Sequence, residues 1–86
     1  MKISTDSITN LNAAILRKEG EAAMRGGDFE IDFSAVVRCD TAAVACLLAW
    51  LRFARAQGKL LRLVALPRDL ISLAKLYGVE ALVTGG

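Results

Sequence analysis

The sequence predicts an α/β fold, with a mixed or mostly parallel sheet of about four strands and about three helices. Three observations support this class. Residues 29–33 (Phe-Glu-Ile-Asp-Phe) strictly alternate apolar and acidic side chains, as in a strand with one wet face. Residues 60–66 are almost all apolar, which favours a central strand. Helical periodicity fills the intervals around these segments, so we expect parallel strands joined by right-handed crossovers.

The N-terminal part predicts one strand and one helix. Residues 2–8 alternate weakly and are interpreted as a short edge strand. Thr9 or Asn10 can cap a helix over residues 11–25, which Gly26-Gly27 ends. Two apolar stripes could face the core. We favour the stripe formed by Ala13, Leu16, Ala23 and Met24. The alternative stripe consists of Leu11, Ile15 and Ala22.

The central helix is predicted to begin at Asp40-Thr41 and to end at Gln57-Gly58, and it is apolar on two faces. One face carries the side chains suited to a core: Ala43, Cys46, Leu47, Trp50, Phe53 and Ala54. The opposite face carries a hydroxyl, two aliphatic residues and both charges, with Ala45 at its edge: Thr41, Val44, Leu48, Arg52 and Arg55. Because of its arginines we expect this second face to meet water. Exposed aliphatic side chains beside a hydroxyl are typical of a docking surface for another protein.

The last third predicts a helix and a short strand. Pro67 suits a first helical turn, and residues 68–77 form the helix. Its apolar stripe has i, i+3, i+4 and i+7 spacing: Leu70, Leu73, Ala74 and Tyr77. Gly78 supplies a left-handed cap, and residues 81–84 predict a final strand.

Composition narrows the classes of function. The 86 residues suffice for one hydrophobic core, so residues 1–86 are expected to form a single domain. A hydrophobic content of 55% indicates that a partner or self-association covers part of the surface. The net charge of +2 is small and its basic residues are scattered, which argues against nucleic acid. The longest apolar run, residues 42–51, is far shorter than the ~20 residues of a membrane span.

Catalytic chemistry finds little support in the sequence. There is no histidine, and Cys39 and Cys46 have the spacing of neither a zinc site nor a redox pair, so we expect reduced cytoplasmic thiols. No glycine-rich phosphate loop is present, so we expect no cofactor, no metal and no independent enzymatic activity. Asp32 and Asp40 are interpreted as an outward strand residue and a helix cap, although they also bracket a loop where α/β proteins place ligands. Thr41 is either a capping residue or a hydroxyl placed for phosphorylation at a helix N-terminus.

At these residues the chain resembles the STAS domain family. The likeness rests on Ile31-Asp32-Phe33-Ser34 at a strand end and Asp40-Thr41-Ala42-Ala43 at a helix start. Within the family it is most similar to the MlaB-type STAS subunit of the Mla phospholipid ABC transporter. The further pointers are the threonine, the helix exit at Ala56 to Lys59, and Leu73 to Gly78. Two features depart from the pattern: alanines replace glycine at 42 and 43, and the N-terminal strand region is short.

The resemblance implies a non-catalytic cytoplasmic subunit that binds the transporter ATPase and, through it, lies near an inner-membrane permease. In such a protein the contact would be made by the helix that begins at Asp40-Thr41. The implied partner-binding residues are Asp40, Thr41, Val44, Ala45, Leu48, Arg52 and Arg55. The alternatives are an anti-sigma factor antagonist switched by phosphorylation of Thr41, and a domain that forms a homodimer through the same face.

Overall fold

All strand pairing is parallel within residues 1–78, the part of the chain that this computed structural model describes. β2 (Glu30–Asp32) pairs with β4 (Arg62–Val64), with Ile31 opposite Leu63. On the other side of β2, Lys2 forms an isolated bridge with Asp32. β1 (Ser7–Ile8) and β3 (Arg38–Cys39) form a second parallel pair. The prediction of an α/β fold with a mostly parallel arrangement is confirmed.

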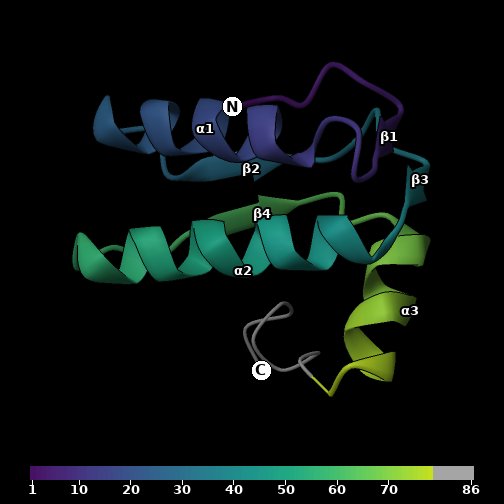
Figure 1. Ribbon diagram of the computed structural model, residues 1–86. Helices are drawn as coiled ribbons and strands as arrows, with labels where there is room; N and C mark the ends of the chain where they lie inside the picture. The colour runs from purple at the N-terminus through teal and green to yellow at the C-terminus, as the bar shows by residue number, and fades with distance from the viewer. Residues whose placement is uncertain (79–86) are drawn as a thin grey trace.

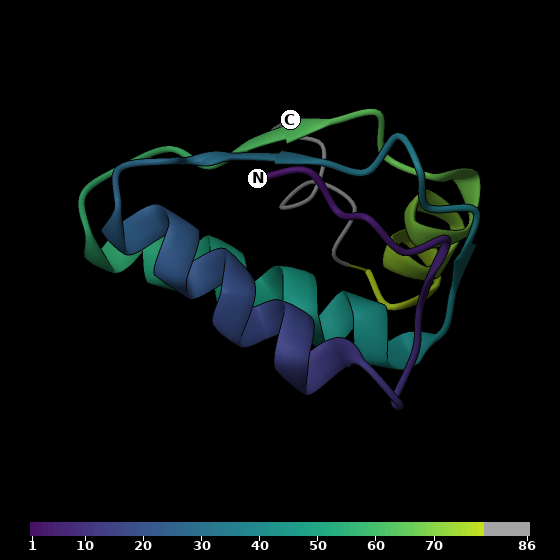
Figure 2. The same ribbon diagram turned by 90° about the horizontal axis from the view of Figure 1, so that it is seen from above.

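The helices lie on one side of the β2–β4 pair. α1 (Ala13–Arg25) and α2 (Thr41–Ala56) run side by side beneath these strands, as Figures 1 and 2 show together. α3 (Arg68–Leu76) packs against α2 close to the end at which α2 begins (Figure 1). This placement covers one flank of the start of α2 and leaves its other end free of α3.

The core fills the space between the strands and the helices. The tryptophan at its centre, Trp50, has no exposed surface, and its ring centroid lies 6.2 Å from that of Phe33. Ile31 and Phe33 point into this core, whereas Glu30 faces solvent and lies 3.6 Å from Arg62 across the strand pair. The alternation of residues 29–33 therefore has the predicted meaning, a strand with one buried and one wet face.

The structure also decides the orientation of the first helix. Leu16, Gly20 and Met24 are buried on its inner side, while Leu11 and Ile15 on the competing stripe are 88% and 64% exposed. The helix begins at Ala13, two residues later than predicted, and Asn12 rather than Thr9 or Asn10 precedes it. The Asn12 side chain instead accepts a hydrogen bond from the Thr9 backbone N–H.

Three strand predictions need correction or lie outside the described part. Residues 60–66 form a strand only over Arg62–Val64, and Leu60 is 95% exposed. Among the described residues β4 pairs with β2 alone, so its predicted central position in the sheet stays a prediction. β3 was missed because Arg38-Cys39 is a two-residue strand without a periodic pattern. The strand predicted over residues 81–84 lies outside the described residues.

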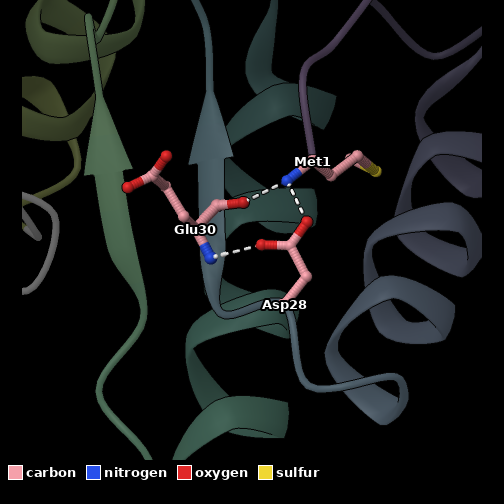
Figure 3. A network of polar contacts seen from close by, with 3 residues as sticks. All are labelled: Met1, Asp28 and Glu30. Carbon is pink, nitrogen blue, oxygen red and sulfur yellow. Dashed lines mark hydrogen bonds and ion pairs between the residues drawn. The ribbon is translucent and has the colours of Figure 1, made fainter.

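The first residues of the chain are fastened to β2 by a polar network, which Figure 3 shows. The ammonium group of Met1 donates to the Asp28 carboxylate and to the Glu30 carbonyl oxygen. Asp28 also accepts a hydrogen bond from the Glu30 N–H at 3.1 Å. The hydrogen bond from the ammonium group, followed by that from Glu30, lowers the pKa of Asp28. This network holds residues 1–3 in register beside β2.

Candidate functional site

The start of α2 is fixed by Asp40, which is its N-cap. One carboxylate oxygen, Oδ1, accepts a hydrogen bond from the Ala42 N–H at 2.8 Å. The other, Oδ2, accepts from the Asn10 N–H at 3.1 Å, and the Asp40 N–H donates to the Ile8 carbonyl. Asp40 therefore ties the first turn of α2 to the loop that follows β1. The interpretation of Asp40 as a helix cap is confirmed. The cap also fixes the position of the next residue, Thr41, in the first turn of α2.

An exposed line of side chains runs along α2 away from this cap, and we call it the α2 ridge: Thr41, Ala45, Leu48, Arg52 and Arg55. Four of these residues are exposed, and Leu48 is half-buried along the flank. The order along the ridge is a hydroxyl, then small or aliphatic groups, then two guanidinium groups. The predicted exposure of this side of the helix is confirmed for all of its polar members.

Val44 does not belong to this exposed surface, contrary to the prediction. Only 6% of it is exposed, and it forms part of the hydrophobic core. Eleven residues separate Val44 from Arg55, which is about three helical turns, so both lie on one line along the helix. α3 packs against α2 close to the end at which α2 begins, whereas Arg55 lies about 16 Å further along the helix than Val44. The same side of the helix is thus buried at its start and wet at its end.

A shallow apolar hollow of about 260 Å³ lies beside the first half of the ridge. It is lined by residues of α2 and by one residue that follows α3: Thr41, Val44, Ala45, Leu48 and Tyr77. Val44 and Leu48 therefore form a hollow in the surface rather than a projecting patch. Sequence reasoning assigned Tyr77 to a core stripe, yet its side chain is 55% exposed. The available signal for this exposure was that Tyr77 directly precedes Gly78, which ends the helix. A side chain at the end of the stripe has no further helical turn beside it to cover it.

A second hollow, of about 310 Å³, lies on the opposite flank of the ridge, between α1 and α2. Small side chains and one arginine line it: Ala13, Ala14, Arg17, Ala42, Ala45, Cys46 and Ala49. Ala45 lines both hollows, so they meet at this residue of the ridge. The result is a surface with a methyl group at its centre and a depression on each side.

The other candidate residues have local structural roles. Asp32 Oδ1 accepts a hydrogen bond from the Ser34 N–H at 2.8 Å, and this bond lowers the pKa of the carboxyl group. The Asp-Phe-Ser segment therefore forms a turn that closes β2. Burial raises the pKa of Cys39 to about 11 and that of Cys46 to about 12, so both are thiols at neutral pH. Across residues 1–78 no group of side chains could hold a metal ion, and none of the helices is long and apolar enough to cross a membrane.

Comparison with known families identifies the fold. A family model described as "Mlab, STAS domain" matches residues 4–84, which is nearly the whole chain. The chain belongs to the MlaB-type STAS domain family. A search of curated proteins finds no match to it. The resemblance predicted from the strand end at Asp32 and the helix start at Asp40 is thereby confirmed at the level of the family.

Membership in this family bears on the role of the α2 ridge. STAS domains are in general regulatory or interaction domains. In this STAS domain the helix that follows the Asp-Thr pair is the one whose outer side carries an exposed ridge and both hollows.

Proposed function

We propose that this STAS domain is a non-catalytic subunit that binds and supports the ATPase of a Mla-type phospholipid ABC transporter. It would act on the cytoplasmic side of the inner membrane, which it would reach through the ATPase and the permease rather than by a span of its own. The α2 ridge and its two hollows form the proposed binding surface. The observation that carries the proposal is the meeting of both hollows at Ala45, next to the exposed Thr41.

The shape of this surface suits a protein partner better than a small molecule. Each hollow is shallow and open, and the first is lined almost wholly by apolar atoms. A small ligand gains affinity when most of its surface is enclosed and a few polar groups orient it. A protein can instead place one side chain in each hollow and cover the ridge between them, burying the small and aliphatic groups at the centre of an interface.

A second function is favoured by the position of Thr41 alone. Its side chain is exposed in the first turn of α2, directly after the capping residue Asp40. Phosphorylation there would put a double negative charge at the rim of the apolar hollow and would oppose binding of an apolar partner. A domain controlled in this way would be an anti-sigma factor antagonist. Incubation with the cognate anti-sigma kinase and ATP distinguishes this function, because only that function predicts phosphate on Thr41.

Co-purification with the transporter ATPase tests the main proposal. The informative variants are Leu48→Asp and Thr41→Glu, each of which adds a carboxylate to the hollow that both residues line. We expect both to remain folded and to lose the ATPase, with a fall in affinity of about tenfold or more. The controls are Leu60→Asp and Ser72→Glu, which place the same acidic residues at exposed positions outside both hollows.

Two outcomes would contradict the proposal. Full retention of the ATPase by folded Leu48→Asp and Thr41→Glu proteins would mean that the partner binds elsewhere. Loss of binding by the Leu60→Asp and Ser72→Glu controls to the same degree would mean that added charge, not its location, weakens the complex.

A further inference from the structure

The far end of the α2 ridge carries an unbalanced positive charge. Arg52 and Arg55 are both exposed, and neither forms an ion pair with a carboxylate among residues 1–78. The only hydrogen bond that the Arg52 side chain makes there runs from its Nε to the Leu48 carbonyl oxygen, at 3.3 Å. α2 contains no acidic residue over its 16 positions, so no carboxylate on the helix itself pairs with the two guanidinium groups.

Of the five other arginines, three have a partner among residues 1–78, whereas Arg38 and Arg68 are exposed and form no ion pair there. Arg62 lies 3.6 Å from Glu30, Arg17 lies 3.9 Å from Glu21, and the Arg25 guanidinium stacks over the Phe53 ring at 5.2 Å. The ridge arginines differ in that they extend the same line of side chains as Thr41 and Ala45. Arg52 follows Ala45 by seven residues, which places it about 10 Å further along the helix.

We infer that the protein partner of this surface carries a cluster of Asp or Glu side chains about 10 Å from the apolar side chain that enters the hollow. This inference rests on the proposed function, because it describes the chemistry of the partner that binds the α2 ridge. Carboxylates accept paired hydrogen bonds from guanidinium groups, so the two arginines set the register of the partner along the helix. They also speed its approach when salt is low.

Affinity measured against ionic strength tests the inference, with the Mla-type ATPase subunit as the probe. Between about 50 mM and 500 mM salt the affinity of the wild-type domain should fall about fivefold or more, because screening weakens exposed charge pairs. Arg52→Gln with Arg55→Gln should bind more weakly at low salt and should lose most of this salt dependence. A matched control is Lys18→Gln with Arg68→Gln, which removes the same charge from exposed positions outside the ridge and the hollows.

A chemical crosslink identifies the partner residues directly. The Arg52→Lys with Arg55→Lys protein keeps both charges, and a carbodiimide then joins a lysine amine to a carboxylate that touches it, with loss of water. Peptides that join position 52 or 55 to an Asp or Glu of the ATPase support the inference. A protein that binds but forms crosslinks only through other lysines contradicts it.

The remaining outcomes separate this inference from the function on which it rests. If Leu48→Asp abolishes binding while the Arg→Gln pair binds normally with unchanged salt dependence, the ridge binds the ATPase and the inference fails. If neither set of variants affects binding, the proposed function fails as well. If the Arg→Gln pair binds the ATPase normally but loses binding to vesicles that contain anionic phospholipid, the arginines face a membrane and the inference is wrong.

Discussion

Trp50 of α2 lies directly against Gly20 of α1. The indole Nε1 donates a hydrogen bond to the Arg17 carbonyl oxygen at 3.0 Å, and a Cβ atom on residue 20 would lie 2.2 Å from that nitrogen. The largest side chain of the core thus reaches the backbone of the neighbouring helix because that helix has no side chain at this position. The two helices that bound the second hollow are held together at this contact.

Gly20→Ala is therefore expected to destabilise the domain. Alanine is favoured over glycine in a helix by about 1 kcal/mol, but overpacking a core costs about 1–3 kcal/mol. The displaced indole would also leave its hydrogen bond to Arg17. We expect the free energy of unfolding to fall by about 1–2 kcal/mol, measured by urea denaturation.

A second variant checks that the cause is the contact with Trp50. In a Trp50→Phe background, where the Nε1 atom is missing, Gly20→Ala should cost clearly less than in the wild type. The same cost in both backgrounds, or a gain in stability from Gly20→Ala alone, would show that the indole does not limit this position.

Ala65, between β4 and α3, has an unfavourable backbone conformation. Its φ is 56°, in the left-handed region that glycine adopts more easily than alanine. Ala65→Gly relieves this strain but makes the unfolded chain more flexible, and the two effects oppose each other. We expect the relief to be larger, with a rise of about 0.5–1 kcal/mol in the free energy of unfolding. Ala22→Gly, at an exposed position inside α1, is the control and should lower it by a similar amount.

Much of this fold follows from local sequence signals. The Asp40 cap, the bulky face of α2 around Trp50 and the alternation at Ile31 and Phe33 are each written in a few consecutive residues. Such signals give the elements and the direction in which each side chain points. For that reason the family likeness and the location of the ridge could both be predicted.

The features of the site that were predicted wrongly or missed depend on contacts between elements that are distant in the sequence. Val44 was predicted to be exposed because it shares a line with Arg55, and only the packing of α3 reveals that this line is covered at one end. Tyr77 joins the hollow, and the alanines of α1 form the second one, through the same kind of distant packing. Helical periodicity gives the direction in which a side chain points from the helix axis, but it does not show which other elements pack beside it. These features therefore could not be predicted from the sequence alone.

The buried thiols predict how stability changes in alkaline solution. Burial raises the pKa of Cys46 to about 12 from its ordinary 9.0, so the folded state holds the thiol proton more tightly than the unfolded state does. The stabilisation is therefore complete below pH 9 and is lost as the pH rises toward 12. The free energy of unfolding should fall above pH 9 by up to about 1.4 kcal/mol per pH unit from this group.

Cys46→Ala isolates this effect from the titration of lysine and tyrosine in the same range. Its free energy of unfolding should decline less steeply between pH 9 and pH 11 than that of the wild type. Parallel declines would mean that the Cys46 thiol ionises equally well in the folded state. Alkylation with iodoacetamide at pH 8 gives an independent measure, because the folded protein should react far more slowly than the unfolded one.

Ala45 offers the sharpest test of the binding surface, because its methyl group lines both hollows. In Ala45→Arg the long side chain would lie over the ridge and fill or block one hollow or the other. Since residue 45 is exposed, the free energy of unfolding should change by less than about 0.5 kcal/mol. The affinity for the Mla-type ATPase should nevertheless fall by about tenfold or more, as measured by titration calorimetry.

Ala22→Arg makes the identical change at an exposed alanine on the outer side of α1, and it should bind like the wild type. Equal binding by the Ala45→Arg and Ala22→Arg proteins would remove the α2 ridge from the interface, because no partner that fills these hollows could tolerate an arginine between them.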